Sequence, residues 1–217
     1  MTFPMPVFCP TKTKAFSYLA TITTSTGTTT RTFASADLGA AASDRLVIVT
    51  VAGTRSTSMT ISSATINGVS ATIIAQATKG GNSVNPTCAI IAATVPTGTS
   101  GDIVITLDVS PSTLRISTYR ASGLSSSTVH ATTTDASGSD TLDVNVPTQG
   151  LVVAVSGQVS VGSSTWSGIT ERTEASVNSM LHSFADSNGL LSASTPLAIS
   201  ASGGSTGNGK SISASWG

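Results

Sequence analysis

Few side chains in this 217-residue sequence could carry out hydrolysis. A hydrolytic triad needs a histidine beside a nucleophile and a carboxylate that orients the histidine. The chain has two histidines: His130 lies in a polar stretch, and His182 lies in a strand-like run, residues 179–184. In such a run we expect a solvent-facing or hydrogen-bonded histidine rather than a catalyst. The sequence contains no Gly-x-Ser-x-Gly elbow, Walker loop, dinucleotide fingerprint or His-Glu-x-x-His motif.

The carboxylates offer little more. Glycosidases use two carboxylates that flank a sugar cleft, and the only glutamates are Glu171 and Glu174. Side chains alternate between the two faces of a regular strand, so this odd spacing predicts that they point to opposite faces. Asp135 and Asp140 are the nearest candidate calcium ligands, but aspartates beside Ser and Gly usually form turns. We therefore expect a non-enzymatic protein with no catalytic residue, metal site or cofactor.

Aromatic side chains could bind a sugar instead, because carbohydrate sites are often paved with them. Aromatic residues make up only 4% of the chain. Tyr119, Trp166 and Trp216 would form a candidate glycan platform if they were exposed together. Packing in the core or at a sheet edge is the alternative for each of the three.

The two cysteines, Cys9 and Cys88, lie in the N-terminal segment and in an apolar run, residues 87–91. Two cysteines do not make a disulfide framework. We expect free thiols, which fits synthesis in a reducing cytoplasm, and pairing of the two is the alternative.

The elements that must position these residues are strands. Residues 45–52 and 150–156 are nearly continuous apolar runs, as expected of central strands, whereas 103–107 and 142–146 alternate apolar and polar side chains. Turn residues punctuate the runs, and no stretch keeps a helical apolar period. We predict an all-β fold of about twelve strands, a two-sheet antiparallel β-sandwich of the jelly-roll kind.

The predicted strands of the first half resemble those of the second half weakly in sequence. The matching pairs are 46–49 with 151–154, 66–69 with 166–169, 103–105 with 197–199, and 114–119 with 210–216. These pairs predict two similar antiparallel halves. Chance likeness between Ser-rich strands is the alternative.

Composition limits the partners. Ser and Thr supply 73 of the 217 residues, only 9% are charged, and the net charge is zero. We therefore expect no binding to nucleic acid or to a membrane. The N-terminus lacks a signal-peptide pattern, and no apolar run approaches the roughly 18 residues of a membrane span. A hydroxyl-rich surface with few charges suits a protein packed among copies or partners.

Residues 1–12 form a predicted extended N-terminal arm, and residues 13–217 a single sandwich domain with a polar bridge near 122–139 between its halves. The arm is apolar and rich in proline, as in segments that dock on a neighbouring subunit. A frayed terminus is the alternative. The candidate assembly residues are Phe3, Pro4, Pro6, Val7 and Phe8.

Four segments, residues 37–49, 61–72, 96–105 and 121–126, resemble β-rich proteins encoded in the structural-gene regions of tailed bacteriophages and prophages. The resemblance extends over residues 30–217. Its motifs are strands and turns, so it carries no catalytic residues over to this chain.

The resemblance implies a virion component: a head decoration protein, a head fibre or spike, or a tail-associated protein. We expect a homo-oligomeric capsid decoration or head-spike protein, made in the host bacterial cytoplasm. It would attach in many copies, partly through the arm, to the major capsid protein or another virion protein. The alternative is a tail or fibre module that recognises host surface glycans, and it requires Tyr119, Trp166 or Trp216 to be exposed together.

Overall fold

The computed structural model describes residues 12–217 except 82, 136–140, 160–161 and 203–208. The described residues form antiparallel strands, turns and loops, and none of them is helical. The all-β antiparallel sandwich class predicted from the strand patterns is therefore confirmed. Because the described residues hold no long apolar helix, none of their segments could cross a membrane as a helix.

Two five-stranded sheets, one from each half of the chain, form the interior. The inner N-sheet has the order β1-β9-β3-β7-β6, with bounds Ala15–Thr24 (β1), Leu46–Arg55 (β3), Thr72–Thr78 (β6), Asn85–Thr94 (β7) and Thr113–Ser122 (β9). The inner C-sheet has the order β10-β18-β12-β15-β14, with bounds Ala131–Asp135 (β10), Leu151–Val159 (β12), Thr170–Val177 (β14), Met180–Asp186 (β15) and Gly209–Trp216 (β18).

Smaller sheets cover the outer faces. The outer N-sheet has the order β2-β8-β4-β5, with bounds Thr30–Asp37 (β2), Ile61–Ile66 (β4), Val69–Ser70 (β5) and Ser100–Leu107 (β8). Two outer ribbons cover the second half: β11 (Val144–Val146) with β16 (Ser194–Leu197), and β13 (Thr165–Ser167) with β17 (Ser200–Ser202).

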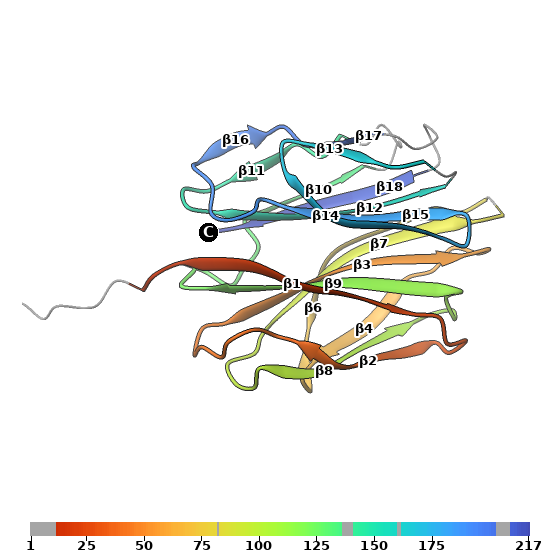
Figure 1. The fold of residues 1–217 in the computed structure, drawn as a ribbon, viewed down its shortest axis with the longest axis horizontal. Helices are drawn as coiled ribbons and strands as arrows, with labels where there is room; N and C mark the ends of the chain where they lie inside the picture. Colours follow the sequence, from red (N-terminus) through yellow and green to blue (C-terminus); the bar gives the residue numbers. More distant parts are fainter. Residues whose placement is uncertain (1–11, 82, 136–140, 160–161, 203–208) are drawn as a thin grey trace, which may run out of the picture.

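These sheets stack in four layers, with the inner N-sheet and the inner C-sheet face to face in the middle (Figure 1). One apolar core lies between each pair of adjacent layers. On β3, Val47 and Val49 belong to the core under the outer N-sheet, while Leu46 and Ile48 belong to the central core. Both faces of this strand are buried, so its sequence has to be apolar at nearly every position.

Four layers replace the two sheets that the sequence predicted. An alternating strand such as β8 buries one face, with Ile103, Ile105 and Leu107 inward. A continuous apolar strand such as β12 buries both faces. Periodicity reports how many faces of a strand are covered, but it does not report which sheet provides the cover, so the number of layers is not encoded in any local pattern.

The two halves share one strand order, which confirms the predicted repeat. The inner N-sheet order becomes the inner C-sheet order when β1, β9, β3, β7 and β6 are replaced by β10, β18, β12, β15 and β14. The sequence pair 46–49 with 151–154 falls on β3 and β12, and the pair 66–69 with 166–169 begins at the end of β4 and within β13. The jelly-roll connection stays a prediction.

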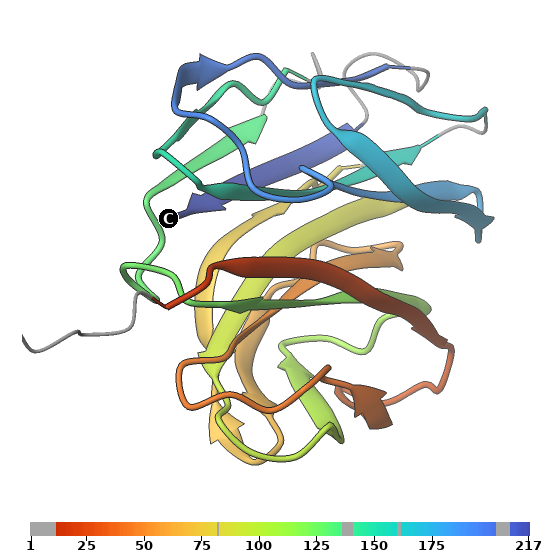
Figure 2. The same ribbon diagram turned by 60° about the vertical axis from the view of Figure 1, so that its left-hand side comes forward.

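The strand registers bring several chain segments to one end of the inner N-sheet. Ala15 pairs with Ser122, Leu46 pairs with Thr94, and Thr72 pairs with Ala92. The bridge between the halves, residues 123–130, crosses to the inner C-sheet at this end, where the C-terminus also lies (Figures 1 and 2). We call this end, with the start of β1, the bridge and the C-terminus, the junction end.

Candidate functional site

The three aromatic residues of the predicted glycan platform are buried. Tyr119 and Trp216 are fully buried in the central core, and Trp166 is 8% exposed in the core beneath the outer ribbons. The Trp166 Nε1–H group donates to Ser183 Oγ at 2.7 Å. The platform prediction is therefore wrong. Tyr119 and Trp216 lie on inner strands with covered faces, and Trp166 points from an outer ribbon into the core.

His182 links the two inner sheets and is fully buried. Its Nε2 lies 2.7 Å from Thr54 Oγ1, and its backbone carbonyl accepts a hydrogen bond from Arg115 Nη1 at 3.0 Å. Burial, and then the charge of Arg115, lowers the pKa of His182 to about 3, so the ring is neutral near pH 7. His130 is exposed in the bridge. Neither histidine takes part in a triad among the described residues.

Other polar and charged side chains lie near His182 between the inner sheets. Arg172 binds Asp186 with two hydrogen bonds, at 2.6 and 2.8 Å, and this pairing raises the pKa of Arg172. The Arg172 guanidinium lies 5.6 Å from the centre of the Tyr18 ring. Arg115 lies 5.4 Å from the centre of the Phe184 ring. These planar cations bridge the two halves where apolar side chains do not fill the space.

The two glutamates lie on the same face, contrary to the prediction from their spacing. A bulge interrupts the register of β14 between them, so that Glu171 lies opposite Ala185 and Glu174 lies opposite Ser183. An extra residue in one strand shifts the alternation of its faces by one. Burial, and then the charge of Glu174, raises the pKa of Glu171, while Glu174 accepts a hydrogen bond from the Ser164 backbone at 2.8 Å.

Among the described residues, this pair does not belong to a group of three side chains that could hold a metal ion. Within the part of the chain that the structure describes, no three His, Cys, Asp or Glu side chains are placed to hold a metal ion. Asp135 is described and buried, whereas Asp140 lies outside the described residues. Cys88 is buried, and its Sγ lies 3.1 Å from the Lys210 carbonyl oxygen. Cys9 also lies outside the described residues, so its state stays a prediction.

Three chain segments meet at Asp44 at the junction end. Its Oδ2 accepts hydrogen bonds from Lys12 Nζ at 3.0 Å and from the Gly123 backbone at 3.1 Å. The bond from Lys12 is the main cause that lowers the pKa of Asp44. Gly123 has a φ of +69°, and a Cβ there would lie 2.5 Å from the Thr13 carbonyl oxygen. Asp44 thus ties the start of β1 to the bridge.

The bridge is also bonded to the C-terminal residue. The backbone N–H groups of Ser125 and Ser126 donate to the Gly217 carbonyl at 2.9 and 3.2 Å. The His130 N–H donates to the Ser215 carbonyl at 2.8 Å, where the bridge enters the inner C-sheet. The junction end is therefore one hydrogen-bonded unit made from both halves.

A buried arginine organises the loops at this end. Arg45 is fully buried. Its guanidinium group donates hydrogen bonds, each 2.7 Å long, to the backbone carbonyls of Gly39, Val95, Thr97 and Gly98. Sequence reasoning gave Arg45 no role. The only sequence feature that could have pointed to Arg45 is its position directly before an apolar run, where the chain enters a buried strand.

Four shallow depressions adjoin one another at the junction end, with volumes of about 290, 360, 280 and 280 Å³. The first three share lining residues of the bridge, the first and third also share Leu46 and Thr94 at the ends of β3 and β7, and the fourth shares Ser43 and Asp44 with the third. Their linings are mostly Ser, Thr, Ala, Leu and Val, and the titratable residues among them are Lys12, Asp44 and His130. This is the candidate functional site: a hydroxyl-rich surface with few charged side chains that can bind by shape and neutral hydrogen bonds.

The predicted assembly residues lie outside the described part of the chain. Phe3, Pro4, Pro6, Val7 and Phe8 all precede Lys12, the first described residue. Their role stays a prediction, but the arm joins the molecule at the junction end through Lys12.

Comparison of the chain with models of protein families, with curated proteins and with solved structures found no match.

Proposed function

We propose that this chain is a non-enzymatic structural protein of a bacteriophage particle, a capsid decoration or head-spike protein that attaches in many copies. The resemblance of residues 37–49, 61–72, 96–105 and 121–126 to phage structural proteins supports the proposal. Under this proposal the protein is made in the host bacterial cytoplasm and resides in the virion.

One observation carries the proposal: the construction of the junction end. The arm joins the molecule beside adjoining depressions whose linings hold few charged side chains. The buried parts of protein interfaces are likewise depleted in charged residues. An arm whose first eleven residues carry no charged side chain and a surface with few charges at the same end suit attachment to another virion protein, such as the major capsid protein.

A glycan-binding module is the function that the aromatic residues would have favoured. That hypothesis required Tyr119, Trp166 or Trp216 on an exposed surface, and all three are buried. We therefore do not propose it.

The test compares particles that carry the complete chain with particles that carry a chain lacking residues 2–10. We expect the complete chain in many symmetric copies on the capsid surface by cryo-electron microscopy, and the shortened chain to be lost from the particle. The circular dichroism of the shortened chain should match that of the complete chain, because residues 12–217 hold the described sheets. Unchanged occupancy would contradict attachment through the arm, and absence of the complete chain from the particle would contradict the proposed function.

A further inference from the structure

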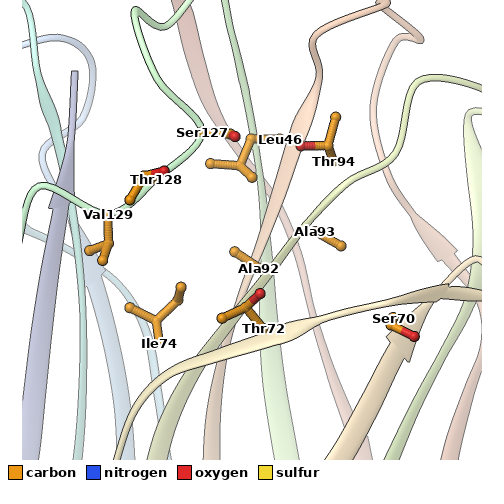
Figure 3. Close-up of a pocket in the computed structure, with 10 residues that line it drawn as sticks. All are labelled: Leu46, Ser70, Thr72, Ile74, Ala92, Ala93, Thr94, Ser127, Thr128 and Val129. Atoms are coloured by element: carbon orange, nitrogen blue, oxygen red, sulfur yellow. The ribbon is translucent and has the colours of Figure 1, made fainter.

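A depression with apolar side chains in its lining lies at the junction end, between the bridge and the start of β6. Ile74 and Val129 face each other across a depression of about 290 Å³, with Leu46 and Ala92 in its wall (Figure 3). Ser127 and Thr128 form its rim. Ligand pockets measure roughly 300–1,000 Å³ and enclose their ligand, so this open depression suits one or two inserted side chains.

The strand beside this depression, β6, lies at the edge of its sheet. β6 is the outermost strand of the inner N-sheet and pairs only with β7 among the described strands. Val69 on β5, just before β6, is the one exposed large apolar residue in the described part of the chain, at 39% exposure. A sheet edge next to apolar side chains is the kind of surface to which a further strand can add.

The first eleven residues have the sequence of a strand that can pair along one edge only. They include no charged side chain, and their prolines are Pro4, Pro6 and Pro10. In an extended chain the N–H groups point alternately to the two sides, so these three prolines remove donors from the same side. The odd-numbered residues keep their N–H and C=O groups on the other side. Phe3, Met5 and Val7 also share one face, which is apolar.

The arm of the same molecule is too short for this pairing. Thr13 lies against Gly123, just past the end of β9. β9 is three strands from β6, so a strand added to β6 lies about 19 Å away at about 4.8 Å per strand. If residues 3–9 pair, the four steps from residue 9 to residue 13 span at most about 14 Å. A second copy of the chain has no such limit.

We propose that residues 3–9 of one copy add as an edge strand to β6 of a second copy, with Phe3, Met5 and Val7 packed towards the depression beside Ile74 and Val129. Each copy then donates one arm and receives another, which builds a ring or a chain of copies. The prolines face outward and prevent a further strand from adding. This inference names the partner of the arm, and it rests on the proposed function for its setting, a lattice of many copies.

The test measures self-association of the complete chain by sedimentation velocity at concentrations up to about 1 mM, so that a millimolar dissociation constant is detected. We expect oligomers, and only monomers when residues 2–10 are deleted. Val7→Pro removes a pairing donor and should weaken association at least about tenfold, whereas Phe8→Pro removes a donor on the unpaired side and should leave it nearly unchanged. Val7→Ala separates the loss of the side chain from the loss of the N–H group.

The receiving surface is tested with Thr72→Lys, at an exposed position in the depression, against Thr32→Lys, at an exposed position on β2 of the outer N-sheet. Only Thr72→Lys should weaken association, because it places a charge where apolar side chains would pack.

A monomeric wild type, or equal effects of Val7→Pro and Phe8→Pro, would overturn the inference even if Thr72→Lys failed to fold. Self-association without binding to the particle would overturn the proposed function alone, and binding to the particle by a chain that stays monomeric would overturn this inference alone.

Discussion

At the scale of single residues, His182 shows how a titratable group can serve a purely structural contact. Its ring is fully buried between the inner sheets and bonded to Thr54 on the opposite sheet. The neighbouring Arg115 guanidinium disfavours a second positive charge. The histidine therefore holds the two halves together only in its neutral form, and this makes the interface sensitive to acid.

This sensitivity can be measured. The pKa of His182 is about 3 in the folded state, below the ordinary value of 6.5, so the unfolded state binds more protons between these limits. The free energy of unfolding should thus fall as the pH falls from 6.5 towards 3, by up to about 5 kcal/mol from this group. Urea unfolding of His182→Gln should show a flatter pH dependence over this range than the wild type.

The matched control is His130→Gln, at an exposed position in the bridge, which should keep the pH dependence of the wild type. Asp44 and Asp108 also have lowered pKa values, but they are present in every variant, so the difference between variants isolates the histidine. Equal slopes for wild type and His182→Gln would contradict a neutral buried role.

At the scale of elements, the contact between the bridge and β1 depends on a backbone that only glycine allows. Gly123 combines a positive φ with a close approach to the Thr13 carbonyl. The same segment holds the chain where the arm begins, through Asp44 and Lys12. The geometry of the arm therefore depends on a residue outside it.

Gly123→Ala should lower the free energy of unfolding by at least about 2 kcal/mol, since a side chain adds a clash to the strain of a left-handed backbone. Gly68→Ala is the control: its φ is +76°, but no atom lies within 4 Å of the added Cβ. That control should lose about 1 kcal/mol from backbone strain alone. Urea denaturation of both variants gives the comparison, and equal losses would show that the contact with Thr13 is unimportant.

At the scale of the whole molecule, the halves are joined by a core that belongs to neither alone. The central core combines Leu46, Ile48 and Ile90 of the first half with Val153 and Phe184 of the second. Separation of the halves would expose this whole apolar face on each inner sheet, and exposed faces of this kind promote association.

We therefore expect residues 12–122 and 123–217, produced separately, to aggregate or to bind the dye ANS strongly, and to lose dye binding when produced together. The complete chain should unfold in one transition observed by both fluorescence and circular dichroism. Two stable, monomeric halves that bind no dye would show that the central core contributes little to folding.

The sequence by itself determined which long runs form strands, whether one face or both faces of these strands are buried, and their repetition, but not the number of strands, predicted as about twelve and eighteen among the described residues. The run at residues 45–52 became the doubly buried strand β3, and the alternating run at 103–107 became the outer strand β8. The repeat 46–49 with 151–154 became two central strands in equivalent sheet positions. These features are local, because periodicity records directly whether one face or both faces of a strand leave water.

Only the tertiary structure decided what surrounds each residue. The bulge in β14 reversed the predicted faces of Glu171 and Glu174, and neighbouring sheets buried Tyr119 and Trp216. The junction at Asp44 joins residues 12, 44 and 123, which no local pattern connects. Bulges, layer stacking and convergent loops arise from long-range pairing, and a single sequence carries no local signal for the partners that such pairing selects.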